Sequence, residues 1–424
     1  MKKKILSFFI LGFMNVLCVS AQETFKVMFY NLLNYPLEDA VPNREDDLAF
    51  ILADYQPDLF LVCELNNITG ANNILNITRT AIDPNFEMAT YVSNTSDDSF
   101  GDQNDLQNLL YYNSSKFSIQ EEIIVPTDLR DFNVYKIRLN TTDQDVNPID
   151  VYVIVCHLKA SSGTLNAQRR FEMVLELDSF LETIPSDSNV LLGGDLNLYT
   201  ASESAFQELL DSSDAITFAD PADRIGSWNN NPNFVDVFTQ STRTQSGLGG
   251  TTGGFDDRFD FILTSENMLS TANVTYVPNS YKVYGNNALI SCYNSAINSS
   301  NCGTISSEFS FEIRDALHNF SDHLPVTLSL EADVTLSTNN NLQLTQNITL
   351  ENTLVNSELN IYIYSSKFLN HPLHVYNQLG QLVAVFQTNS DQKQTFNINN
   401  LNNGLYVIKV SESNTKPLKF IVSH

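Results

Sequence analysis

Residues 189–199, with the sequence NVLLGGDLNLY, combine an apolar run with two glycines, an acid and an amide. The run predicts a buried strand, and Asp195 and Asn197 stand at its carboxyl end. A core strand needs no carboxylate there, whereas α/β folds commonly build sites from polar residues at strand ends. Gly193 and Gly194 let the backbone approach closely or turn without a Cβ clash, which suits a loop that holds a ligand. The stretch therefore predicts a strand with a site at its end.

The same arrangement recurs along the chain. Other polar residues at or near the ends of apolar, strand-like runs are Asn31, Glu64, His157, Asp260, Asp322 and His323. Taken singly, such a residue is more often a cap or a satisfied core polar group. Because so many strand ends carry one, the pattern favours a single site assembled from several strands.

Residues 22–332 mix β-hairpin-like runs with β-helix-β units. The segments PDLFLVCEL and DVYVIVCHLKA are typical of buried strands, and LNAQRRFEMVLELDSFLETI has the spacing of an amphipathic helix. Strands outnumber helices. The predicted fold class is therefore α/β, a sandwich of two sheets with helices on the outside.

An initial Asn followed in order by the motifs CEL, CHLKA, GGDLN, RFDFIL and SDHLP resembles the endonuclease/exonuclease/phosphatase superfamily. Members of this superfamily include deoxyribonuclease I, abasic-site endonucleases, sphingomyelinases and inositol-phosphate phosphatases. The resemblance covers about residues 24–331. It implies a four-layer α/β/β/α sandwich and a metal-dependent hydrolase of phosphoric ester bonds.

The metal ligands are expected to be hard oxygen atoms. Carboxylate and amide oxygens without thiolates favour Mg²⁺, with Mn²⁺ or Ca²⁺ as alternatives, and two histidines alone would be a poor zinc set. Glu64 is the expected ligand by this chemistry and by the resemblance. Asn31 and Asp322 are the expected helpers, directly or through metal-bound water.

The resemblance also implies roles for five catalytic residues. Asp195 would position or deprotonate the attacking water, and Asn197 would hold that water or a phosphate oxygen. His323 would contact the phosphate or act as a base, with Asp260 fixing its tautomer. His157 would be the second phosphate-facing histidine and the candidate acid. The sequence leaves open which histidine donates the proton.

Two departures from the superfamily pattern concern Asn31 and His157. Leu33 stands two residues after Asn31, where many relatives carry an acid or another polar group, so a second metal position is not expected there. The expected partner of His157 is Asn108, where deoxyribonuclease-like enzymes offer a glutamate. Asn31 and Asn108 are accordingly the predicted substrate-binding residues.

Both ends of the chain predict export. Residues 1–21 have the lysines, short apolar stretch and small-residue end of a secretory signal, with an uncleaved membrane anchor as the alternative. Residues 333–345 are a predicted linker, and residues 346–424 alternate short strands with Asn- and Gly-rich turns, which predicts a small all-β sandwich. The segments HVYNQLGQLV, INNLNNGLYVIKV and KFIVS resemble the sorting domain of the type IX secretion system. A carbohydrate- or partner-binding module is the alternative.

The cysteines are compatible with an exported protein. CYNSAINSSNC predicts a disulfide between Cys292 and Cys302, and Cys63 and Cys156 are expected to be buried thiols.

Two loops carry no specific motif. GLGGTTGGFDD is interpreted as a flexible loop beside the site, and SDDSFGDQND as a solvated loop with calcium binding as the alternative.

Charge bears on the substrate. The formal net charge is −26, and loss of the three signal-peptide lysines takes it to −29, all within residues 22–332. Such a field argues against a general nucleic-acid binder and suits a site that brings in its own cations. The favoured function is a secreted nuclease acting on DNA, with RNA as a further substrate. A phosphoesterase for phospholipids or small phosphates and a non-catalytic surface protein are the alternatives. The expected partners are a nucleic-acid substrate and the outer-membrane secretion machinery, for a monomer without stable membrane insertion.

Overall fold

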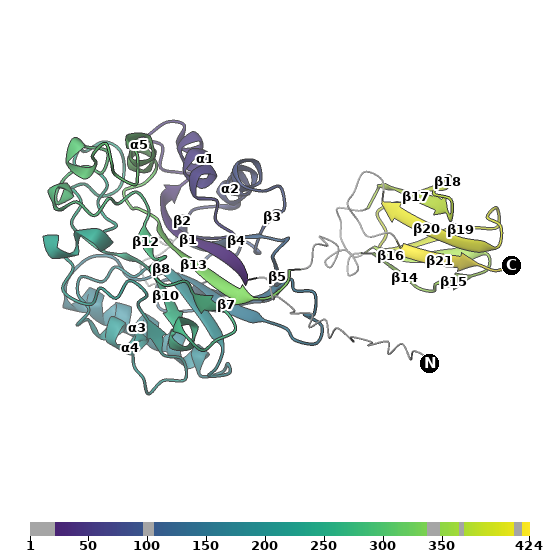
Figure 1. The fold of residues 1–424 in the computed structure, drawn as a ribbon, viewed down its shortest axis with the longest axis horizontal. Helices are drawn as coiled ribbons and strands as arrows, with labels where there is room; N and C mark the ends of the chain where they lie inside the picture. Colours follow the sequence, from purple (N-terminus) through teal and green to yellow (C-terminus); the bar gives the residue numbers. More distant parts are fainter. Residues whose placement is uncertain (1–21, 96–105, 337–347, 364–368, 411–417) are drawn as a thin grey trace, which may run out of the picture.

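The computed structural model describes residues 22–95, 106–336, 348–363, 369–410 and 418–424 (Figure 1). The predicted signal peptide, the SDDSFGDQND segment and most of the predicted linker lie outside these residues. The described chain forms a larger α/β body that ends near residue 336 and a smaller all-β body from residue 348 onward. None of the described helices is long and apolar enough to cross a membrane.

The first sheet of the larger body contains seven strands, in the order β11-β13-β1-β2-β4-β3, with β12 also paired to β13. Strand β1 is parallel to β2 and antiparallel to β13. The strand bounds are β1 Gln22–Tyr35, β2 Leu59–Leu65, β3 Phe86–Met88, β4 Gln107–Asn113, β11 Thr275–Tyr276, β12 Lys282–Val283 and β13 Val326–Asp333.

The second sheet contains six strands, in the order β5-β6-β7-β8-β10-β9. Strands β7 and β8 are parallel, and β10 runs antiparallel to β8 with Asp260 opposite Asp195. The bounds are β5 Phe117–Val125, β6 Phe132–Leu139, β7 Asp150–His157, β8 Asn189–Asp195, β9 Phe218–Ala219 and β10 Asp260–Ser265.

Helices cover the outer faces of both sheets, which confirms the predicted four-layer α/β/β/α sandwich (Figure 1). The first sheet is covered by α1 (Arg44–Tyr55), α2 (Ile68–Ala81) and α5 (Phe311–Phe320), and the second by α3 (Thr164–Leu181) and α4 (Ser204–Leu209). Short 3₁₀ turns are η1 (Pro232–Val237), η2 (Glu266–Leu269), η3 (Ile290–Cys292) and η4 (Ser300–Cys302).

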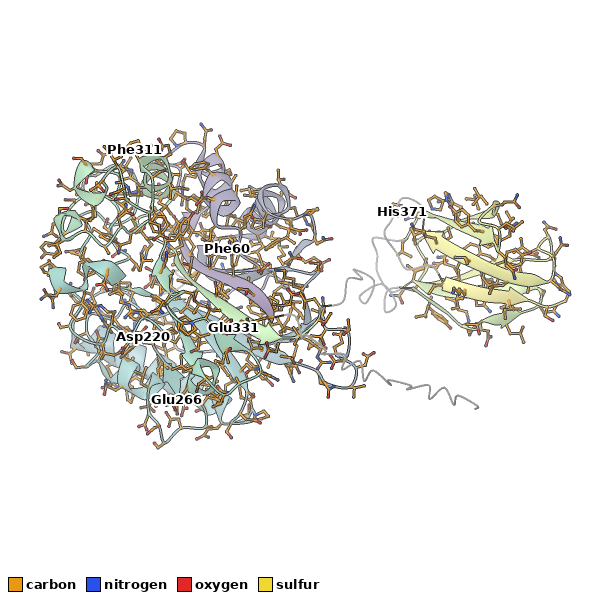
Figure 2. All side chains as sticks on the ribbon, viewed as in Figure 1. Phe60, Asp220, Glu266, Phe311, Glu331 and His371 are labelled. Carbon is orange, nitrogen blue, oxygen red and sulfur yellow. A yellow bond between two sulfur atoms is a disulfide. The ribbon has the colours of Figure 1, made fainter. Side chains whose placement is uncertain are left out.

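The sandwich explains why the central strands read as continuous apolar runs. In β7, Val153 and Val155 belong to the core between the sheets, whereas Ile154 and Cys156 belong to the core beneath α3 and α4. Both faces are therefore buried, and each such side chain contributes roughly 1.5–3 kcal/mol by its removal from water. In Figure 2, Phe60 lies inside this body and Phe311 at its surface, with exposed fractions of 0% and 54%.

The two glycines of the GGDLN motif lie inside strand β8, so they serve packing rather than a ligand-holding loop. A Cβ on Gly193 would lie 2.7 Å from Leu61 of the facing sheet, and a Cβ on Gly194 would lie 2.3 Å from the sulfur of Cys156. Heavier residues would push β8 away from its neighbours. Gly193 thus lets β8 approach the first sheet, and Gly194 makes room for Cys156 of the adjacent strand β7.

Among the cysteines, Cys292 and Cys302 form the predicted disulfide, and Cys63 and Cys156 are buried free thiols. The disulfide links η3 to η4.

The smaller body is a β-sandwich, as predicted. Its sheets have the orders β14-β16-β19 and β15-β21-β20-β17-β18. The strands are β14 Ile348–Leu350, β15 Leu354–Val355, β16 Glu358–Ile363, β17 Pro372–Asn377, β18 Leu382–Gln387, β19 Lys393–Asn397, β20 Gly404–Val410 and β21 Leu418–Val422. Leu359, Ile361, Val375 and Phe420 are fully or almost fully buried in its separate core.

Candidate active site

The sandwich brings the predicted polar residues together at one edge of the two sheets. Parallel strands end, and antiparallel strands begin, at the same edge of a sheet. The ends of β1, β2, β7 and β8 therefore meet the beginnings of β10 and β13 there. The residues at this edge are Asn31, Glu64, His157, Asp195, Asn197, Asp260, Asp322 and His323.

Asn31 joins the two sheets through its side-chain amide. Its Nδ2 donates to Oε1 of Glu64 at 3.0 Å and to Oδ2 of Asp195 at 3.1 Å. The other oxygen of Glu64 accepts from the backbone N–H of Asn34 at 3.0 Å. Glu64 itself has a φ of 58°, in the left-handed region that costs a non-glycine residue of order 1–3 kcal/mol. Burial and the neighbouring Asp322 raise the pKa of the Glu64 carboxyl.

Asp195 lies between the two histidines. Its Oδ2 is 3.6 Å from Nε2 of His157 and 3.9 Å from Nε2 of His323, and its Oδ1 accepts from the backbone N–H of Asn197 at 3.1 Å. Burial raises the pKa of Asp195 to about 8, and the charges of Asp260 and Glu64 contribute to the rise. Asn197 has a φ of 52° and donates its side-chain N–H to the carbonyl of Leu158.

His323 is held by Asp260. The distance between His323 Nδ1 and Asp260 Oδ2 is 2.7 Å, so Nδ1 carries a proton that it donates to the carboxylate. Burial alone would lower the pKa of His323, but the carboxylates of Asp260, Asp322 and Asp195 raise it well above its ordinary value. The structure therefore places at this position a histidine that favours its charged form.

His157 has the opposite preference. Burial, together with the positive charge of Arg130, lowers the pKa of His157 well below its ordinary value. Its Nδ1 is buried and has no hydrogen-bond partner among the described residues. Asn108, its expected partner, instead donates from Nδ2 to the carbonyl of Asp131 at 2.9 Å and to Oδ1 of Asn133 at 3.1 Å. No hydrogen bond joins Asn108 to His157 within the described part of the chain.

The carboxylates fit a divalent cation. Glu64, His157 and Asp195 each offer one ligand atom, and the three atoms lie within 4.8 Å of one another. Oδ1 of Asp322 is buried without a hydrogen-bond partner among the described residues, so it too retains free lone pairs. Carboxylate oxygens suit Mg²⁺, Mn²⁺ and Ca²⁺, and the imidazole nitrogen suits Mn²⁺. Leu33 is buried, and no carboxylate occupies its position.

The sequence did not indicate three residues that contact or support this site. The side-chain amide of Gln240 lies 2.6 Å from Nε2 of His323, and the backbone N–H of Thr251 donates to Oδ2 of Asp322 at 2.6 Å. Arg243 donates to four backbone carbonyls, those of Leu248, Gly249, His318 and Asn319. All three lie in irregular loops without strand or helix periodicity.

The glycine-rich loop at residues 247–254 does lie beside the site, as expected, and Arg243 and Asp322 hold it there. A Cβ on Gly250, whose φ is 61°, would meet the carboxyl carbon of Asp322 at 2.5 Å. Only glycine suits that contact. Contacts with Arg243 and Asp322 therefore hold the loop at the site, whereas the sequence predicted a flexible loop.

Comparisons with known proteins bear on the two bodies separately. Residues 355–423 match the family described as a secretion system C-terminal sorting domain. The C-terminal body is a sorting domain. It indicates export to the cell surface or the extracellular space and an interaction with the secretion machinery, as predicted. No curated protein matches the sequence significantly.

The larger body is similar to solved structures of endonuclease/exonuclease/phosphatase proteins. One, from Bacteroides thetaiotaomicron, has 14% identity and a TM-score of 0.44, with 74% of this chain and 96% of the other covered. Another, from Bacteroides vulgatus, has 13% identity, a TM-score of 0.45 and coverages of 73% and 99%. The catalytic domain of human nocturnin has 13% identity, a TM-score of 0.44 and coverages of 72% and 94%. Identities this low transfer no activity, so the function is argued from the site.

Proposed function

We propose that the protein is a secreted phosphodiesterase that depends on a divalent metal and acts as an endonuclease on extracellular DNA, with RNA as a further substrate. The observation that carries the proposal is the joint presence of four carboxylates and two histidines with opposite protonation preferences at one strand edge. These residues are Glu64, Asp195, Asp260, Asp322, His157 and His323. The sorting domain supports the extracellular location.

Hydrolysis of a phosphodiester makes three demands on such a site. The charge on the non-bridging oxygens must be neutralised, a water must be aligned with the bond that breaks, and the leaving oxygen must receive a proton. Four carboxylates would repel a phosphate. Glu64, with Asp322 and Asn31, would hold the cation, Mg²⁺ or alternatively Mn²⁺ or Ca²⁺. When bound, the ion supplies positive charge for the phosphate oxygens.

The protein's own side chains divide the remaining work. Asp195 and Asn197 orient the attacking water. Asp195 takes its proton as the water oxygen forms the new bond to phosphorus and the bond to the leaving oxygen breaks. Asp260 keeps His323 oriented, so that the Nε2 side of its ring can face the phosphate next to the amide of Gln240. The sequence made His157 the candidate donor for the leaving oxygen, but the lowered pKa of His157 and the raised pKa of His323 favour His323 in that role. Asn31 holds Glu64 and Asp195 at a fixed separation.

The charges near the site favour a second candidate, a phosphoesterase for phospholipids or small phosphorylated molecules. Six described arginines of the larger body are at most 8% exposed and bind backbone carbonyls or carboxylates: Arg44, Arg130, Arg170, Arg243, Arg258 and Arg314. They are therefore not available to bind a phosphate polymer. A non-catalytic surface protein remains the third candidate, and we propose a monomer without membrane insertion.

The test uses the chain from residue 22 onward, supercoiled plasmid DNA and bis-p-nitrophenyl phosphate, each with Mg²⁺ or with chelator. Relaxation of the plasmid that needs metal and is lost in Asp195→Asn would support the nuclease. Hydrolysis of the small diester without plasmid relaxation would favour the second candidate. An Asp195→Asn variant with full activity would contradict the site itself.

A further inference from the structure

Gln240 contacts two site residues at once. Its side-chain amide nitrogen lies 2.6 Å from Nε2 of His323 and 3.4 Å from Oδ2 of Asp322. Because Nδ1 of His323 is already bonded to Asp260, the contact with Gln240 engages the second ring nitrogen. The imidazole is therefore held at both nitrogens, and the contact on the Nε2 side comes from an uncharged residue.

The backbone fixes Gln240 in place from two sides. Gln240 forms isolated β-bridges to Asp257 and to His323. Its N–H donates to the carbonyl of Asp257 at 3.0 Å, and its carbonyl accepts from the N–H groups of Asp256 and Asp257, each at 2.9 Å. On the other side, the N–H of Leu324 donates to the carbonyl of Thr239, the residue before Gln240. Only 9% of Gln240 is exposed, so its side chain has little freedom to leave.

A primary amide suits this position chemically. While Nε2 of His323 is neutral, the NH₂ group has two hydrogens and can donate to Nε2 and to the carboxylate of Asp322 together. When Nε2 is protonated, a half-turn of the amide lets its carbonyl accept from the ring, and the hydrogen bond to Asp322 is then given up. Either arrangement holds the ring without adding charge beside Asp195. Asn31 does the same for Glu64 and Asp195.

We propose that Gln240 is a positioning residue, whose amide holds the imidazole of His323 and the carboxylate of Asp322 in the orientation in which they meet the phosphoester. The proposal rests on the proposed function. It adds a residue that lies outside every motif at the site. Because Gln240 acts through His323 and Asp322, its loss should slow the chemical step and leave substrate affinity unchanged.

The experiment compares Gln240→Ala and Gln240→Met with wild type. Methionine fills the volume of the side chain without its hydrogen bonds, so it separates positioning from packing. Gln207→Ala is the matched control, because Gln207 donates to the carbonyl of Ala201 on the outer surface of the body. Thermal unfolding checks that each variant is folded.

The first measurement is steady-state hydrolysis of bis-p-nitrophenyl phosphate with saturating Mg²⁺. We expect kcat to fall about 100-fold in both Gln240 variants with KM unchanged, because misplacement of a catalytic group by about 1 Å can cost that much. Gln207→Ala should match wild type. A Gln240→Met variant with wild-type kcat would overturn the proposal, as would a rise in KM with kcat intact.

The second measurement needs no catalysis. Diethyl pyrocarbonate modifies accessible imidazole nitrogens, and peptide mass spectrometry follows the modification of each histidine. Loss of the amide should speed the modification of His323 severalfold and leave that of His157 unchanged. If the wild type hydrolyses no phosphoester, the proposed function fails. The modification rates then decide the positioning alone, with an unchanged rate at His323 overturning it.

Discussion

Replacement of Asp260 by asparagine tests the pairing that prepares His323. Asp260 is fully buried, and asparagine keeps its size and one acceptor oxygen while it removes the charge. At an effective dielectric constant of about 20, unit charges at the separation of this pair interact by about 6 kcal/mol. Most of that energy is offset, since the hydrogen bond survives and a buried charge is removed. A hydrogen bond to a charged group contributes about 1.5–3 kcal/mol net and a neutral one about 0.5–1.5 kcal/mol, so the difference of about 1–1.5 kcal/mol should lower kcat about 10-fold.

The assay is the initial rate of bis-p-nitrophenyl phosphate hydrolysis at saturating Mg²⁺. Asp256→Asn is the matched control, because it removes a carboxylate from the loop just before β10 without touching His323. Both variants should unfold at temperatures close to that of wild type. Full activity in Asp260→Asn would refute the role of the pair. An equal loss in both variants would instead point to the general charge of the region.

Three further predictions concern the metal and the fold. Mg²⁺ or Mn²⁺ should raise the unfolding temperature of wild type, and at a concentration of 100 times Kd the gain in stability is about 2.7 kcal/mol. The unfolding temperature of Glu64→Gln should not change with the metal. Equal shifts for the two proteins in a thermal melt would contradict Glu64 as a ligand. Arg258→Met should lower the free energy of unfolding by about 3–5 kcal/mol in urea titrations, because it leaves the buried carboxylate of Asp220 unpaired. A loss well under 1 kcal/mol would contradict the importance of this ion pair. Burial, together with Asp214 and other acids, raises the pKa of Asp178 to about 6, above its value in the unfolded chain, so its ionisation costs stability above pH 6. Asp178→Asn should therefore raise the free energy of unfolding by about 1 kcal/mol or less at pH 8, because solvent screens the charge, and should have no effect near pH 4. Urea titrations measure both values. A lower free energy of unfolding at pH 8 would be the contrary result.

The helices and strands with a regular pattern of apolar and polar residues could be predicted from the sequence. Apolar runs of strand length identified the central strands, and the placement of polar residues at their ends indicated where the strands deliver them. Asn31, Glu64 and Asp195 come from three strands of two sheets, yet their side chains are hydrogen-bonded at 3.0 and 3.1 Å. Strand direction brings Asn31 and Glu64 to the same edge of the first sheet, and the packing of the two sheets brings Asp195 beside them.

The loop contributions could not be predicted in the same way. Gln240 and Thr251 reach His323 and Asp322 from segments whose path is set by isolated bridges and backbone hydrogen bonds. The spacing of residue types in the sequence does not predict contacts made by irregular loops. The role of Gly193 was also hidden, because its neighbour Leu61 is more than a hundred residues away in the sequence and in the other sheet. An expected pair failed for a similar reason: the amide of Asn108 donates to Asn133 in β6 of the other sheet and to Asp131, which precedes β6.

The acidity of the chain and its expected need for a metal have one physical origin. With 49 acidic and 23 basic residues, the chain has few cations, and six described arginines of the larger body are buried and bind carbonyls or carboxylates. Those arginines fasten the loops around the site: Arg44 binds the carbonyls of Leu32 and Phe320, and Arg243 binds those of Leu248 and His318. The carboxylates at the strand ends then lack enough fixed positive charge to balance them. We therefore expect a cation from solvent to bind at these carboxylates before a phosphate does.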